Sequence, residues 1–268
     1  MIRVELVKML RRPRTWITIA LLNSLPTLVA VLLALTDLGP RPGTGPAFLA
    51  AVLADGTLFP LAAMAIVLPL FLPVAVAVMA GDAVAGEAQA GTLRYLLVRP
   101  VGRTRLLVAK LVSVIAFVLL TVVAVAAVGY VVGVLLLGDQ PLATSVSGTT
   151  LTQQELAVRT LGAVGYVTLS MLGVAAVALL LSTVTDSALG AALGALAFLI
   201  ASTVLLTLDA ADALRPYLPT RYWLDFVDLF RDPILWRDIV RGVGLQGVYV
   251  VVFLAAAWAN FTTKDITS

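Results

Sequence analysis

The chain has 268 residues, of which 61% are hydrophobic and 12% are charged, with a formal net charge of +3. Soluble domains are about 45–50% apolar and about 25% charged, so this composition excludes a water-soluble globular fold. Cysteine and histidine are absent, which excludes disulfides, Cys/His zinc sites and histidine acid–base chemistry. Apolar stretches close to the ~20 residues that cross a bilayer as a helix predict one all-α polytopic transmembrane domain over residues 1–268. We expect about six transmembrane helices and no metal site.

Residues 1–14 form a short basic segment with two distinct faces in a helical projection. One face is apolar and the other is charged. The apolar face holds Ile2, Leu6, Met9 and Leu10, and the charged face holds Glu5, Lys8, Arg11 and Arg12. This pattern predicts an amphipathic N-terminal elbow helix that lies on a membrane surface.

The first predicted span covers residues 15–36 and contains Pro26, which should kink it. The second, residues 57–80, is interrupted by prolines at 60, 69 and 73. Such breaks are tolerated in lipid only where neighbouring helices or a cavity satisfy the freed backbone groups. The other four spans are predicted at 106–137, 160–181, 187–208 and 242–261.

Three features of the connections and spans also bear on the fold. A short helical stretch is predicted near residues 150–158, with Thr150 and Gln153 at capping-box spacing. Residues 209–241 are expected to form a re-entrant or interfacial helical segment on the external side, with an amphipathic helix between Arg221 and Arg231 whose pattern Leu224 does not fit. Small-residue stripes, which favour packing within one subunit over a dimer seam, lie at Gly129 and Gly133 and at Gly190, Gly194, Ala197 and Ala201.

Lysine and arginine cluster at residues 3–14 and 94–110. Cytoplasmic loops are enriched in these residues, so we place both clusters, and with six spans both termini, in the cytoplasm. The expected location is the bacterial inner (plasma) membrane, as a multi-pass protein in contact with the lipid bilayer. The basic residues flank the spans, where they orient the chain, so no nucleic-acid partner is expected.

No ionisable residue falls in the middle of a predicted span, and Lys110 and Arg159 lie near span ends, where they could snorkel to the interface. Ion- and proton-coupled carriers usually need buried ionisable groups, so this class is disfavoured. The three lysines, Lys8, Lys110 and Lys264, do not follow the glycine of a G-x-x-x-x-G-K-[ST] phosphate loop. The chain is therefore not expected to be an ATPase or another enzyme, and uphill transport would take its energy from a partner chain.

Residues 86–110 combine a glutamate, a Gly-Thr-Leu triplet, an apolar pair, a proline and basic residues that lead into the third span. The positions are Glu87, Gly91, Thr92, Leu93, Leu96, Leu97, Pro100, Arg103 and Lys110. This stretch resembles the signature of ABC-2 type transporter permeases, in which Arg or Glu often precedes the glutamate; Ala85 and Gly86 stand there in this chain. The resemblance implies an exporter with a second permease subunit, as a homo- or heterodimer, and two ABC ATPase subunits. Those subunits would bind ATP and Mg, and this chain would hold no cofactor.

Residues 81–105 are thus a candidate cytoplasmic coupling segment. A short helix over residues 83–90, ended by Gly91, could enter a groove of the ATPase and offer the Glu87 carboxylate to a basic wall. The candidate coupling residues are Glu87, Gly91, Thr92, Leu93 and Arg94. The alternative is a basic loop that only sets the topology.

Candidate residues for a translocation path between two subunits are polar groups on the first and fifth spans. They are Asn23, Ser24, Thr27, Ser202, Thr203 and Thr207, although Ser and Thr in spans often bond their own helix backbone. The aromatic residues Trp223, Phe226 and Phe230 are candidates for an external gate or, alternatively, an aromatic belt.

The transported solute is expected to be hydrophobic or amphipathic. The rival functions are an ion- or proton-coupled carrier, a non-transporting membrane anchor or sensor for a soluble ATPase, and a membrane-embedded enzyme. An enzyme would need a clustered catalytic set. The densest acidic group, Asp225, Asp228 and Asp232, is interleaved with arginines and lacks histidine.

Overall fold

The structure is a computed structural model that describes residues 1–36, 52, 55–91, 102–138, 143–144, 147 and 149–263. Its α-helices are α1 (Ile2–Arg11), α2 (Pro13–Leu35), α4 (Phe59–Val67), α5 (Phe71–Gln89), α7 (Arg103–Leu137), α8 (Gln153–Val184), α9 (Ala188–Thr207) and α10 (Trp236–Thr263). The shorter elements are η1 (Gly56–Leu58), η2 (Asp209–Ala211), η3 (Arg215–Tyr217), η4 (Asp225–Phe230) and the antiparallel pair β1 (Ala143–Thr144) and β2 (Thr150–Leu151).

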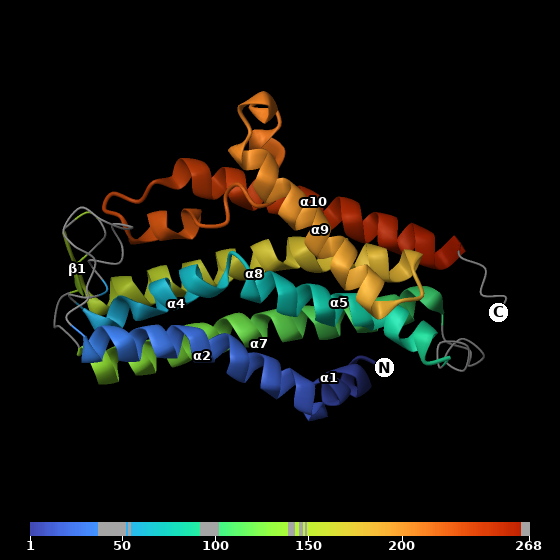
Figure 1. The fold of residues 1–268 in the computed structure, drawn as a ribbon, viewed down its shortest axis with the longest axis horizontal. Helices are drawn as coiled ribbons and strands as arrows, with labels where there is room; N and C mark the ends of the chain where they lie inside the picture. Colours follow the sequence, from blue (N-terminus) through green and yellow to red (C-terminus); the bar gives the residue numbers. More distant parts are fainter. Residues whose placement is uncertain are drawn as a thin grey trace.

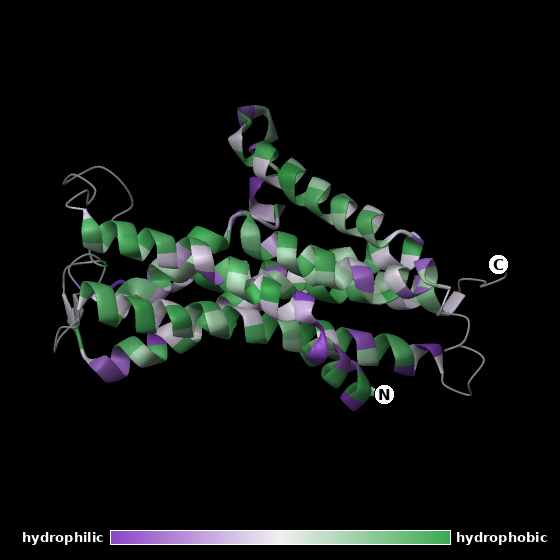
Figure 2. Cartoon of the chain, turned by 60° about the horizontal axis from the view of Figure 1, so that its bottom comes forward, coloured by the Kyte–Doolittle hydropathy of each residue, from purple (hydrophilic) through white to green (hydrophobic). Residues whose placement is uncertain are grey.

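Within the described residues, six helices are long and apolar enough to cross a membrane: α2, α5, α7, α8, α9 and α10. This confirms the prediction of an all-α polytopic membrane protein with six spans. The helices form an elongated bundle in which α1 and the last turns of α10 lie at one end, called here the termini end (Figure 1). The β1–β2 pair lies at the opposite end, called the hairpin end. Hydrophobic residues dominate the helix surfaces, as a lipid-facing bundle requires (Figure 2).

The N-terminal elbow forms as predicted. Arg12 is extended between α1 and α2, and α2 begins at Pro13, whose fixed φ and missing N–H suit a first helical position. The orientation of α1 differs from the prediction. Glu5 and Lys8 are partly buried against the bundle, while the apolar Ile2 is 45% exposed. The reason is electrostatic, because partners of opposite charge on α5 and α7 bind Glu5 and Lys8.

The second span is broken as the prolines indicated. The helices α4 and α5 follow one another along the bundle and are separated by turns at residues 68–70 (Figure 1). Close contact with α7 keeps α4 in place. The two helices pack so tightly that a Cβ on Gly129 of α7 would lie 3.0 Å from the Cβ of Ala63 on α4. The Gly129 and Gly133 stripe therefore packs within the subunit, as predicted.

The fourth span is longer than predicted, because the stretch near residues 150–158 and the span form one continuous helix, α8. Its capping box uses Thr152 and Glu155 rather than Thr150 and Gln153. The side chain of Thr152 accepts from the Glu155 N–H, and the Glu155 carboxylate accepts from the Thr152 N–H at 2.9 Å. This reciprocal pair fixes where α8 begins.

The chain between α9 and α10 is re-entrant. Elements η2 and η3 project from the side of the bundle about midway along its long axis, and η4 then returns beside α8 (Figures 1 and 2). Side chains of α10 hold this segment: Tyr249 donates to the Tyr217 carbonyl at 3.0 Å, and Gln246 donates to the Pro219 carbonyl at 2.7 Å. The projection is thus anchored to the bundle.

The amphipathic α-helix expected around residues 221–231 is instead a series of turns and the 3-10 helix η4. In a 3-10 helix, side chains three positions apart align. Trp223, Phe226 and Leu229 therefore share a buried face, whereas Leu224, which did not fit an α-helical pattern, is exposed. Phe230, six positions after Leu224, is also buried, so packing against the neighbouring helices α8 and α10, and not the period alone, decides which side chains are buried.

The packing of α7 against η1 predicts the effect of one added methyl group. A Cβ on Gly133 would lie 2.2 Å from the Gly56 carbonyl oxygen and 2.5 Å from Phe59 Cβ, whereas one on Gly165 would meet open space. Gly133→Ala should destabilise the fold by about 1–3 kcal/mol through overpacking, and Gly165→Ala should not. Thermal unfolding of both variants in detergent measures this, and equal midpoints would contradict the contact.

Candidate functional site

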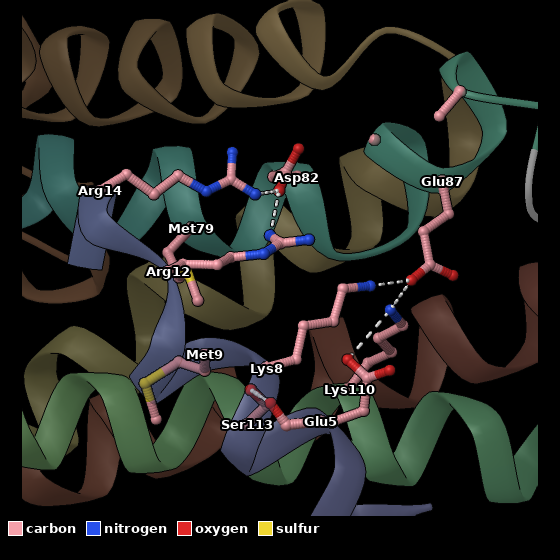
Figure 3. A pocket seen from close by; sticks show the side chains of 12 residues that line it. Glu5, Lys8, Met9, Arg12, Arg14, Met79, Asp82, Glu87, Lys110 and Ser113 are labelled. Atoms are coloured by element: carbon pink, nitrogen blue, oxygen red, sulfur yellow. Dashed lines mark hydrogen bonds and ion pairs between the residues drawn. The ribbon is translucent and has the colours of Figure 1, made fainter.

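Four charged side chains from α1, α5 and α7 meet at the termini end and are called here the charge network: Glu5, Lys8, Glu87 and Lys110 (Figure 3). Glu87 Oε1 accepts from Lys8 Nζ at 3.0 Å and also accepts from Lys110 Nζ. Lys110 Nζ also donates to Glu5 Oε2 at 3.2 Å. The network therefore ties the elbow helix to the end of the second span and the start of the third.

The centre of the charge network is buried, with Lys110 only 5% and Glu87 only 8% exposed. The prediction that Lys110 snorkels to the interface is therefore wrong, because its ammonium pairs with two carboxylates inside the bundle. Burying a charge is costly unless it is paired, and removing one partner of a buried pair typically costs 3–5 kcal/mol. At Lys8, burial lowers the pKa, but the hydrogen bond and charge of Glu87 outweigh it and raise the pKa above its usual value.

A second group of ion pairs lies beside the charge network. Asp82 Oδ2 accepts from Arg12 Nη1 at 3.2 Å and from Arg14 Nη2 at 2.5 Å (Figure 3). The two groups line a cavity of about 340 Å³ between α1, α5 and α7. No group of three or more potential metal ligands occurs among the described residues. The arrangement suits mechanical linkage between helices.

A hydroxyl group from α8 binds the backbone of α5 just before Glu87. Ser182 Oγ, from α8, donates to the Gly81 carbonyl at 2.6 Å and accepts from the Ala85 N–H at 2.9 Å. In a regular helix these two backbone groups would bond to each other, and an inserted side chain bends the helix. We call residues 81–85 the hinge. The part of α5 that follows it carries Glu87 and turns away from the bundle axis (Figure 1).

The geometry corrects one part of the predicted coupling segment. Residues 83–90 are the end of α5 rather than a separate helix, and the Glu87 carboxylate faces Lys8 and Lys110 rather than a partner groove. The prediction that Gly91 ends the helix is confirmed, since its φ of +66° lies in the left-handed region that favours glycine. Thr92, Leu93 and Arg94 lie outside the described residues.

Most of the candidate path residues bond their own helices. Asn23, Thr27 and Thr203 bond carbonyls four residues earlier, and Ser24 and Thr207 bond carbonyls three residues earlier. Ser202 differs, because its hydroxyl lies 2.7 Å from Thr220 Oγ1. The principal neighbours of α2 are α7 and α4, and those of α9 are α5 and α8. The two sets are therefore not brought together within one chain.

A cavity of about 270 Å³ lies where the second span is broken, and Pro69, Pro73, Thr203 and Trp223 contribute to its wall. The two prolines have no N–H, so they leave carbonyls without their regular helical donors. The buried Trp223 indole N–H has no hydrogen-bond partner among the described residues. The cavity wall is thus largely apolar and includes Thr203.

The three gate candidates, Trp223, Phe226 and Phe230, are buried in the main hydrophobic core. This placement differs from both an exposed lid and an aromatic belt. The neighbouring Asp225 is half-buried, and burial together with the charges of Asp228 and Asp238 raises its pKa to about 6, against the opposing effect of Arg221.

Sequence reasoning missed the charge network and the hinge. Glu5 and Lys8 were visible as the polar face of α1, but their partners are far away in the sequence, Glu87 lying 79 residues after Lys8. Lys110 offered the clearest signal, since a lysine beyond the first turn of an apolar helix requires a counter-ion. Nothing in the sequence indicated that Ser182 would enter the ladder of α5.

These features define a polytopic all-α membrane protein with an N-terminal elbow, a broken second span and a re-entrant segment before the last span. The chain belongs to the DUF2705 family, described as a protein of unknown function, whose sequence profile matches residues 44–267. No curated protein matches the chain.

The raised pKa of Asp225 predicts a pH dependence of stability. The folded state binds this proton more tightly than the unfolded chain, so stability should fall as the pH rises from about 4 to about 6. Asp225→Asn should remove this component, which we expect to be about 1 kcal/mol for a half-exposed carboxylate. Thermal midpoints of parent and variant at pH 4.5 and pH 7.5 measure it. An unchanged pH dependence in the variant would exclude Asp225 as its source.

Proposed function

We propose that this chain is the membrane-spanning permease subunit of an ATP-driven ABC-2 type transporter that exports a hydrophobic or amphipathic solute. In this proposal the termini end lies in the cytoplasm of a bacterium, where separate ABC ATPase subunits bind ATP and Mg. The chain itself holds neither and performs no catalysis. The six spans, the elbow helix and the resemblance around Glu87 support this assignment.

One observation carries the proposal. The charge network and the hinge give the end of α5 a defined mechanical connection to α1, α7 and α8. A load applied at Gly91, where α5 ends, would pass through Glu87 to the elbow and through Ser182 to α8. Coupling between a soluble ATPase and a membrane bundle needs an element whose position both partners can change. In this proposal the end of α5 is that element.

The proposed solute path uses the cavity at the broken second span. Discontinuous helices form many transport sites because their freed backbone groups can bind a solute at mid-membrane depth. The cavity wall includes the Thr203 side chain in a largely apolar surface. A hydrophobic solute with one or two hydrogen-bonding groups matches this lining.

We further propose that a second permease subunit packs against α9. Two residues of the small-residue stripe on α9, Ala197 and Ala201, are exposed in this chain. Because small residues let helices approach closely, a helix of another subunit could pack there. The adjacent projection carries Asp209 and Asp212, whose side chains are 101% and 67% exposed. Midway along a membrane bundle, exposed charges need a protein surface or a water-filled cavity to cover them.

The burial of Lys110 between two glutamates favours a second candidate function, an ion- or proton-coupled carrier, because such carriers use buried ionisable groups. Solute flux into liposomes that contain only this chain and a proton gradient would support it. An ATPase that the chain stimulates without any solute flux would instead favour a membrane anchor or sensor.

Loss of the Glu87 charge should uncouple the transporter. Glu87→Gln keeps the side-chain shape but removes the carboxylate that pairs with Lys8 and one of the two carboxylates that pair with Lys110. Transport per ATP hydrolysed should therefore fall about tenfold or more. The matched control is Glu155→Gln, at the hairpin end, which should transport like the parent. The assay uses inverted vesicles with the co-purifying ATPase at equal protein levels. Normal coupling in a well-folded Glu87→Gln variant would remove the charge network from the proposed mechanism.

The proposed seam on α9 can be tested by cross-linking, because the parent chain has no cysteine. Ala201→Cys should give a dimer under mild oxidation in membranes. Val251→Cys, at a position on α10 that is also exposed, should remain monomeric. Cross-linking of Val251→Cys alone would place the subunit contact on the other face, and no dimer with either variant would argue against a homodimer with this contact.

A further inference from the structure

The largest cavity described here is a groove of about 580 Å³ near the hairpin end, between η1 and α4 on one side and α7 and α8 on the other. Its floor is buried and includes Pro60, Ala126 and Leu156, while Val123, Ala157 and Leu161 on its rim are exposed. The groove therefore has a fixed floor and opens on the face of the bundle that lipid covers.

The depth of the groove follows from helix geometry. Tyr130, in its wall, is twenty residues beyond Lys110 on α7, and Thr160 is twenty-two residues before Ser182 on α8. At 1.5 Å per residue both separations are about 30 Å, the thickness of the hydrocarbon layer. Taking the charge network and the hinge as one boundary of that layer places Tyr130 and Thr160 at the other.

Polar and apolar groups are separated along the groove. The hydroxyls of Tyr130 and Thr160 make no hydrogen bond within the described part of the chain, and they lie at the membrane boundary. Toward the membrane centre the wall continues with Val123 and Val164. Among the residues that the structure describes, no Asp, Glu, Lys or Arg lines the groove, so its chemistry selects an uncharged or zwitterionic polar group joined to a hydrocarbon chain.

We propose that this groove binds one single-chain amphiphile from the leaflet at the hairpin end. Its polar head group bonds the Tyr130 and Thr160 hydroxyls, and its hydrocarbon chain lies over Ala126 and Val164. The volume falls within the range of about 300–1,000 Å³ that is usual for small-molecule sites. A transmembrane helix, about 10 Å across, does not fit. The site is separate from the cavity at the broken second span and does not depend on the proposed ATP-driven transport.

The test uses a lysophosphatidylcholine with a diazirine in its acyl chain, added to the full chain in phosphatidylcholine nanodiscs. After illumination, mass spectrometry maps the adducts. We expect adducts within residues 123–130 and 156–164 that unlabelled lysophosphatidylcholine displaces in a saturable manner. Labelling that is uniform around the bundle and cannot be competed would overturn the proposal, because it would show ordinary boundary lipid.

Two filling variants test the location. Ala157→Phe fills the groove from its rim, where folding is not at risk, and Ala126→Phe fills it from the floor; each should reduce the competed adducts at least fivefold. Leu135→Phe, at a position on α7 that is 76% exposed and outside the groove, should label like the parent. If Ala157→Phe folds normally and labels like the parent, the amphiphile does not occupy this groove.

The head-group contact has its own test. The double variant Tyr130→Phe and Thr160→Val removes both hydroxyls and keeps the groove's shape. Half-saturation of the labelling should therefore need about fivefold more lysophosphatidylcholine. Unchanged half-saturation would show that the hydroxyls do not bind the head group and would overturn that part of the proposal.

Discussion

The buried pair of Lys110 and Glu87 is the interaction on which the termini end of the bundle depends. Neither charge can remain inside the protein alone, so α5 and α7 must meet where these side chains meet. Glu5 and Lys8 then complete the charge balance, which fixes the direction in which the elbow helix crosses the bundle. An amphipathic helix that could otherwise lie anywhere on the membrane surface is thereby given one position.

The second constraint is the need to satisfy backbone groups inside the membrane. Two places in the second span depart from the regular helical ladder, and each is stabilised differently. At residues 68–70 prolines break the helix beside a cavity, and at residues 81–85 the Ser182 hydroxyl binds backbone groups of α5. The span therefore consists of two helices, α4 and α5, whereas α7 and α8 are continuous. Motion is most easily accommodated between those pieces.

The fold was largely predictable from sequence because hydrophobic length and proline position act locally. The spans, the elbow, the broken second helix and the end at Gly91 all follow from neighbouring residues. The site was less predictable, because the partners of Lys110 come from two other helices and their contact depends on how the bundle packs. The segment around Phe226 was assigned the wrong helix type because its buried side chains have the spacing of an α-helical face, whereas the backbone forms turns and a 3-10 helix.

The length of α7 has a consequence outside the membrane. Its 35 residues extend about 52 Å, which exceeds a hydrocarbon layer of about 30 Å by several turns. Since Lys110 lies two turns from its start and Tyr130 two turns from its end, about half of the excess stands beyond the opposite boundary, together with the first turns of α8 and the β1–β2 pair. The protein thus carries a rigid helical stalk into the aqueous phase, which offers antibodies and proteases a structured epitope on a chain that is otherwise largely enclosed by lipid.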